Sequence, residues 1–198
     1  MDLVMIDYGA GNVQSVQYAL ERLGHRAEIS ADPERVARAD KVIFPGVGAA
    51  KASMEALRAR GLAEAIPKLQ QPILGICVGM QVMGSSSDEG DTTCLGIVPG
   101  RVRKFASGLQ VNVPHMGWNT LQNVQDWIPQ TAANHHVYYV HSYAMDVGDY
   151  TTATTRYADF TFSAALRYRN FYGTQFHTEK SGDLGSQILA SWLAAPTT

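Results

Sequence analysis

The sequence predicts an α/β fold, with an open, mostly parallel central sheet flanked by helices and with additional antiparallel strands. In the first half, short apolar runs alternate with segments of helical periodicity, which is the pattern of parallel β-α-β units. After about residue 90 this periodicity fades, and strand-like runs rich in Thr, Val, Tyr and Phe follow one another. The chain has 198 residues and no linker or repeat, so we expect one domain over residues 1–198.

The expected elements of the first half are short apolar strands and amphipathic helices separated by glycine and proline. We expect strands at residues 3–6, 26–30, 41–44 and 72–76. Helices are expected at residues 13–23, after Asp32 with Pro33 in the first turn, and at residues 49–66 with a break near Gly61.

The second half is expected to consist mainly of strands. Their predicted ranges are residues 101–105, 110–112, 138–143, 151–156, 162–168 and 171–176. An amphipathic helix at residues 184–193 follows them.

The composition excludes several classes of protein. With 45% hydrophobic and 17% charged residues the chain is globular, and a formal net charge of −2 without a basic cluster argues against nucleic-acid binding. No apolar run approaches the length of a membrane span, and the N-terminus does not resemble a secretory leader, so we expect a cytoplasmic protein. A reducing cytoplasm suits free thiols, although a disulfide between Cys77 and Cys94 stays open as an alternative.

A cysteine at a sharp turn is the first candidate for catalysis. Residues 75–79, Gly-Ile-Cys-Val-Gly, directly follow an apolar strand and match a nucleophile elbow with Cys in place of Ser. Glycines on both sides of Cys77 suit a strained strand-to-helix turn, where neighbouring chains crowd. The free N–H groups of a following helix would favour the thiolate. The alternative is a small buried apolar cysteine.

Partners for a thiol nucleophile occur near the C-terminus. His177 and Glu179 are one residue apart, so in extended chain their side chains would point to the same side. Glu179 would then orient the imidazole, and His177 would take and return the proton of Cys77. Alternatives are a histidine in a polar network beside a solvated Glu, and a metal site, which lacks the usual tight ligand spacing. We expect no metal and no cofactor.

An oxyanion hole could form beside the elbow. Residues 45–48, Pro-Gly-Val-Gly, follow the third predicted strand, which neighbours the elbow strand in a doubly wound sheet. Glycines there let backbone N–H groups turn toward the reacting carbon, and the N–H of Val78 would be a second donor. An ordinary glycine-rich loop is the alternative.

Residues 75–81, Gly-Ile-Cys-Val-Gly-Met-Gln, and the Phe-His-Thr-Glu-Lys-Ser of residues 176–181 resemble the class I (triad) glutamine amidotransferases, which implies a flavodoxin-like sheet. Further stretches are similar to the glutaminase subunits of imidazole glycerol phosphate synthase, an enzyme of histidine biosynthesis. They lie at residues 6–12, 44–49, 96–102, 113–119 and 139–143. The resemblance extends from about residue 3 to about residue 190.

The resemblance implies a role for each matching residue. Cys77 would attack the side-chain amide of glutamine to form a glutamyl thioester, His177 would protonate the leaving ammonia and then activate water, and Glu179 would hold His177. The oxyanion hole would comprise Val47, Gly48 and Val78. The substrate contacts would come from Gly48, Gln81, His141, Ser142 and Tyr143.

The resemblance also implies a heterodimer with a (β/α)8-barrel cyclase subunit. Ammonia would pass to this partner, which makes imidazole glycerol phosphate and AICAR. Residues near the partner would be Asn12, His115, Met116, Trp118, Asn119 and Tyr138. Without the resemblance, the alternation of Met116 and Trp118 favours one buried strand face.

The chain departs from the family pattern at two positions. Thr178 stands where the family usually has Pro, and Val78 where Leu is common. Because Thr also prefers extended backbone, we expect the triad to persist with slightly more freedom. The rival functions are a free-standing thiol hydrolase and a non-catalytic scaffold subunit.

Overall fold

A seven-stranded sheet lies at the centre of the molecule in a computed structural model that describes residues 1–105 and 112–196. Its strand order is β11-β12-β13-β4-β3-β1-β2. Five strands are parallel: β1 (Leu3–Ile6), β2 (Glu28–Ser30), β3 (Lys41–Gly46), β4 (Ile73–Cys77) and β13 (Phe171–Thr174). Their order, with β13 as fifth strand, is the flavodoxin-like 2-1-3-4-5. The antiparallel strands β11 (Thr151–Tyr157) and β12 (Phe160–Tyr168) extend the sheet, so the predicted fold class is confirmed.

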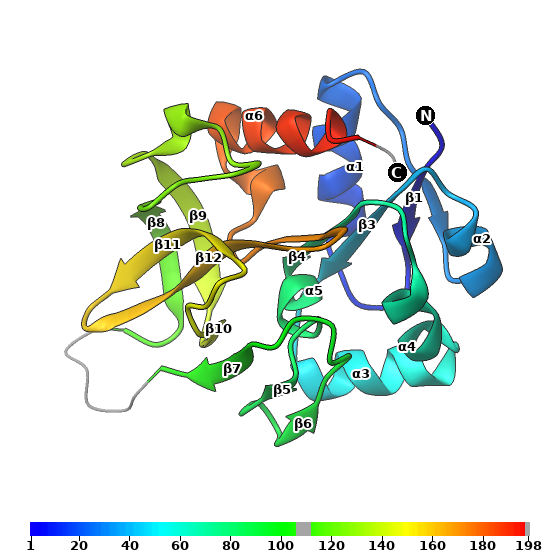
Figure 1. The fold of residues 1–198 in the computed structure, drawn as a ribbon, viewed down its shortest axis with the longest axis horizontal. Coiled ribbons are helices and arrows are strands. Elements are labelled where there is room, and N and C mark those ends of the chain that lie inside the picture. The colour runs from blue at the N-terminus through cyan, green and yellow to red at the C-terminus, as the bar shows by residue number, and fades with distance from the viewer. Residues whose placement is uncertain (106–111, 197–198) are drawn as a thin grey trace.

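Helices cover both faces of this sheet (Figure 1). Helices α1 (Val13–Arg22) and α6 (Gly182–Leu193) lie over one face, and α3 (Ala50–Ala59) and α4 (Leu62–Ala65) over the other. The short α2 (Pro33–Ala37) and η1 (Ile66–Lys68) complete the first half. Strands covered on both sides must be apolar throughout, and every residue of β1 and β4 is buried.

Local sequence sets the helix ends. The side chain of Asn12 accepts a hydrogen bond from the backbone N–H of Ser15 and caps α1, and Asp32 caps α2 in the same way through the N–H of Glu34. The predicted break near Gly61 is confirmed, because this residue has a left-handed φ of 70° between α3 and α4.

Two smaller sheets lie beside the central one. One has four strands in the order β10 (Tyr143–Met145), β7 (Arg101–Lys104), β5 (Ser86–Ser87) and β6 (Thr92–Thr93). In the other, β8 (His115–Thr120) pairs with β9 (His136–His141). The predicted strand 138–143 is thus wrong as a single element, since the chain changes sheets at Ser142. The strand expected at residues 110–112 falls largely outside the described residues.

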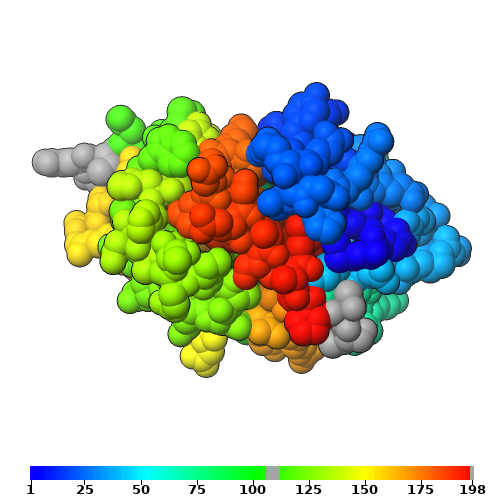
Figure 2. Space-filling view, turned by 90° about the horizontal axis from the view of Figure 1, so that it is seen from above, coloured from blue at the N-terminus to red at the C-terminus, as the bar shows by residue number. Residues whose placement is uncertain are grey.

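The C-terminal helix closes one side of the molecule. In Figure 2, helix α6 lies between the N-terminal segments and the residues around β8 and β9 on the same face. None of the helices in the described part of the chain is long and apolar enough to cross a membrane.

Candidate active site

Cys77 occupies a strained turn at the carboxyl end of β4. Its φ of 54° and ψ of −111° are rare for a residue with a side chain, as a nucleophile elbow requires. A Cβ at Gly79 would overlap the carbonyl oxygen of Phe44, and one at Gly75 would lie 2.7 Å from the backbone nitrogen of Met80. Only glycine fits these two positions, which explains the spacing. The helix that follows, α5 (Val78–Gln81), is a single turn.

His177 and Glu179 meet, but not through extended chain. His177 is extended, with φ −85° and ψ 101°, and the next residues form the short helix η3 (Thr178–Lys180). This turn brings Glu179 back, so that His177 Nδ1 lies 2.7 Å from Glu179 Oε1 with both side chains at most 2% exposed. The condition of an extended chain from His177 to Glu179 is not met, although the predicted contact is present.

The electrostatic environment of His177 favours the imidazolium. Burial opposes protonation, but hydrogen bonding and charge interactions with Cys77 and Glu179 outweigh it and raise the pKa of His177 to about 10. His177 Nε2 is buried and has no hydrogen-bond partner. A protonated imidazole there would stabilise a thiolate on Cys77.

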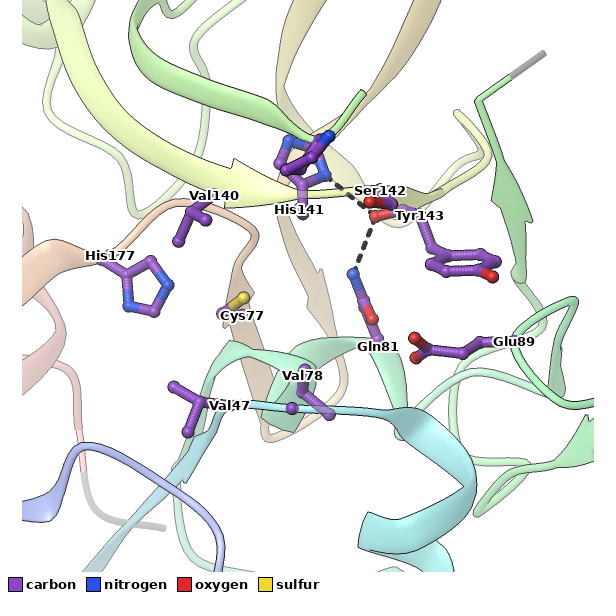
Figure 3. A pocket seen from close by; sticks show the side chains of 12 residues that line it. Val47, Cys77, Val78, Gln81, Glu89, Val140, His141, Ser142, Tyr143 and His177 are labelled. Carbon is purple, nitrogen blue, oxygen red and sulfur yellow. Dashed lines mark hydrogen bonds between the residues drawn. The ribbon is translucent and has the colours of Figure 1, made fainter. Parts of the chain in front are cut away.

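A cavity of about 320 Å³ opens over the sulfur. Figure 3 shows Cys77 and His177 on its wall, with Val47 and Val78 on one side and the segment from Val140 to Tyr143 on the other. Every residue expected to form the oxyanion hole or to contact substrate lines this cavity: Val47, Gly48, Val78, Gln81, His141, Ser142 and Tyr143.

The segment proposed for the oxyanion hole lies directly beside the nucleophile. Strand β3 pairs in parallel with β4, and Gly46 is the register partner of Cys77. Val47 and Gly48 therefore extend past the sulfur, and Gly48 has a φ of +91° that favours glycine.

Two residues of the site had no signal in the sequence argument. Gln175 is fully buried and its Nε2 lies 3.7 Å from Cys77 Sγ. Its position two residues before His177, on a strand-like segment, could have indicated a shared side. Glu89 also lines the cavity, and its carboxylate accepts a 2.7 Å hydrogen bond from the backbone N–H of Ala50. It lies in a loop far from any motif.

The residues expected near a partner fall into two groups. Met116 and Trp118 project from β8 with 63% and 56% of their surface exposed, so the buried-face interpretation is wrong. The Trp118 ring lies 5.9 Å from that of Tyr138 on β9. His115 points the other way and is buried, Asn119 contacts it, and Asn12 caps α1.

The second cysteine is separate from this site. Cys77 and Cys94 are both free thiols, so the disulfide alternative is wrong for this structure. Burial raises the pKa of Cys94 to about 11, which leaves it unreactive at neutral pH. The described residues contain no group of three histidine, cysteine or carboxylate side chains that could hold a metal ion.

Comparison with known proteins agrees with the geometry. Residues 4–195 match the family model "Glutamine amidotransferase class-I". The chain is 48% identical to "Imidazole glycerol phosphate synthase subunit HisH" of Bacteroides fragilis (98% of this chain, 99% of the relative) and 42% identical to the protein of that name from Idiomarina loihiensis (98% and 97%).

Solved structures share the fold at low sequence identity. One described as "Crystal structure of glutamine amidotransferase" has a TM-score of 0.74 at 19% identity, with coverage of 98% of this chain and 100% of that one. PurLQS from Thermotoga maritima has a TM-score of 0.71 at 17% identity, with coverage of 97% of both chains. On the full-length family match and these relatives, the chain belongs to the class I glutamine amidotransferases.

Proposed function

We propose that this chain is the glutaminase subunit of imidazole glycerol phosphate synthase, which acts in histidine biosynthesis. It hydrolyses L-glutamine to glutamate and ammonia for a partner subunit. The observation that carries the proposal is that Cys77 and His177 line one cavity, with Glu179 2.7 Å from His177 Nδ1. The relatives that bear that name match over nearly their whole length. The family match over residues 4–195 supports one domain spanning residues 1–198.

The site residues suit a two-step acyl transfer. The Cys77 thiolate attacks the side-chain amide carbon of glutamine, and the imidazolium of His177 gives its proton to the leaving nitrogen, so that ammonia departs and a thioester remains. Neutral His177 then takes a proton from water, which attacks the thioester, and glutamate leaves as the thiolate re-forms. Glu179 orients the ring and stabilises its charged form in both steps.

The developing oxyanion would be held by backbone N–H groups of Val47, Gly48 and Val78. Gly46 lies in register with Cys77, which supports this assignment. Because Gly48 is exposed and lacks a Cβ, a peptide flip in this segment has a low steric cost, and it offers a way to restrain hydrolysis until the partner is ready.

Recognition of glutamine would use the opposite wall. Gln81 and the backbone at His141, Ser142 and Tyr143 offer donors and acceptors for the polar groups of the amino acid. The carboxylate of Glu89 adds a negative charge that suits an α-ammonium group.

The partner would be a (β/α)8-barrel cyclase that receives the ammonia through a channel, in a cytoplasmic heterodimer. The exposed pair Met116 and Trp118, with Tyr138 beside it, supports β8 and β9 as part of the docking face. Aromatic and Met side chains are enriched at such interfaces, and this exposure is costly in water without a partner.

The test is glutamate release from glutamine by the purified chain, alone and mixed with a cyclase subunit in the presence of its ribulosyl nucleotide ligand. Low activity alone that rises in the mixture supports a partner-gated glutaminase. Cys77→Ala should abolish release without loss of partner binding, and Cys94→Ala is the matched control that should retain it. High activity that is the same with and without the cyclase would favour a free-standing hydrolase. No activity in either case would favour a scaffold.

A further inference from the structure

A buried hydrogen-bond network joins the sulfur of Cys77 to strand β8. Its central acceptor is the backbone carbonyl of Tyr143, from which one branch leads to the sulfur and the other to β8. The side chains in order from the sulfur are Gln175, Gln81, His141, His115 and Asn119. The first four of these are each at most 6% exposed.

The Tyr143 carbonyl fixes the branch toward the sulfur, because a carbonyl oxygen only accepts hydrogen bonds. The amide nitrogen of Gln81 donates to it at 2.8 Å and lies 3.0 Å from Gln175 Oε1. Gln175 must present its oxygen to that donor, which leaves its NH₂ group on the other side. This group lies 3.7 Å from Cys77 Sγ. Figure 3 shows the preceding hydrogen bond of this branch, from Gln81 to the Tyr143 carbonyl.

The same carbonyl fixes the branch toward β8. His141 Nδ1 lies 2.9 Å from it and must carry the proton, so in the neutral ring Nε2 accepts. His115 Nδ1 then donates to His141 Nε2 at 3.0 Å, and His115 Nε2 accepts from the amide of Asn119 at 3.2 Å. Burial lowers the pKa of His141 to about 3 and that of His115 to about 4, so both rings stay neutral at physiological pH.

We propose that Gln175 is a further catalytic residue, whose amide N–H donates to Cys77 Sγ and stabilises the thiolate, and that Gln81, His141 and His115 are positioning residues for this amide. A donor to the charged form of an acid lowers its pKa, and a fully buried donor has no water to replace it. The assignment rests on the proposed function only in taking Cys77 as the nucleophile.

The network also gives the docking strand a physical connection to the sulfur. His115 and Asn119 belong to β8, whose other face carries the exposed Met116 and Trp118. The Tyr143 carbonyl can only accept, so it fixes Gln81 Nε2 and His141 Nδ1 as donors. The donor and acceptor of each further hydrogen bond in the two branches follow from this and cannot be exchanged.

The test is the pH dependence of alkylation of Cys77 by iodoacetamide, measured by mass spectrometry in a Cys94→Ala background. Gln175→Met keeps the length of the side chain and removes the donor. It should raise the apparent pKa of alkylation by about half to one pH unit. An unchanged profile in a folded Gln175→Met protein would overturn the assignment.

A second pair of variants tests the positioning residues and serves if Gln175→Met does not fold. His115→Asn can keep a donor near the Nδ1 position, whereas His115→Phe cannot. The Phe variant should raise the apparent pKa by a smaller amount than Gln175→Met, and the Asn variant should resemble the parent. If the His115→Phe and His115→Asn proteins show the same pH dependence of Cys77 alkylation, the proposed network is wrong. Alkylation needs neither glutamine nor a partner, so its result stays separate from a failure of the proposed function.

Discussion

Glu179 accepts a 2.7 Å hydrogen bond from His177 Nδ1 across a turn of the backbone, although only one residue separates them. His177 has an extended backbone, and the helix η3 begins at Thr178. This turn reverses the direction of the chain, so that the Glu179 side chain reaches the His177 ring. The second carboxylate oxygen, Glu179 Oε2, is buried and has no hydrogen-bond partner. The contact with the imidazole is therefore the main interaction that offsets the desolvation cost of the buried carboxylate. The charged state of Glu179 consequently depends on that of His177.

Glu179→Gln tests this coupling. The amide keeps the shape of the side chain but removes the charge that helps to raise the pKa of His177, so the imidazolium is less stable. We expect glutamine turnover by the complex to fall by up to about 10⁴-fold, the loss seen when a triad loses its charged orienting group. Steady-state kinetics would check this, and turnover within a factor of two of the parent would show that Glu179 does not support His177.

Thr178→Pro should stabilise the protein. Thr178 is the first residue of η3, where proline is tolerated, and His177 has the extended backbone that a following proline requires. The change also removes a buried hydroxyl that has no hydrogen-bond partner. We expect a gain of about 0.4–1 kcal/mol in the free energy of unfolding with unchanged turnover. Urea denaturation would measure it, and a loss of stability would indicate a backbone at Thr178 that proline cannot adopt.

The sequence predicted best where local rules and packing agree. Strand β1 has the expected bounds, and the elbow at Cys77 follows from two glycines whose positions admit no side chain. The neighbouring position of β3 follows from the winding of a parallel sheet.

The parts that could not be predicted depend on what surrounds the chain. An apolar alternation predicts which residues share a face but not whether that face is covered, and so Met116 and Trp118 were open to opposite interpretations. Strand β9 ends at His141 because the next residues pair with β7 in another sheet, a choice that local sequence does not encode. The spacing of Gln175 from His177 could have indicated a shared side, but the sequence does not show whether a glutamine amide is buried or solvated.

Acid should destabilise the protein through the buried histidines. The pKa of His141 in the fold is about 3, against 6.5 in the unfolded chain, and that of His115 is about 4. At a pH between the folded and the unfolded pKa of each histidine, the unfolded state binds more protons than the folded state. The free energy of unfolding therefore falls as the pH decreases below about 6.5. Each histidine contributes at most about 1.4 kcal/mol per pH unit in that window.

Urea denaturation at pH 7, 6 and 5 would measure this dependence. His141→Asn removes one titrating group and can keep a donor to the Tyr143 carbonyl, so its stability should decline less steeply with acid. The exposed His136→Asn is the matched control and should decline as the parent does. Parallel curves for all three proteins would show that His141 does not titrate as described.

Gly79→Ala should disrupt the elbow, because its Cβ would overlap the carbonyl oxygen of Phe44 on the adjacent strand. Since both partners are backbone atoms, relief requires β3 and α5 to separate, and the loss should exceed about 3 kcal/mol. Gly24→Ala is the matched control: its φ is +77°, but nothing lies within 4 Å of the added atom. Backbone strain alone should then cost about 1–2 kcal/mol. Thermal unfolding would compare them, and similar losses for both would mean that the overlap at Gly79 is relieved without separating β3 from α5.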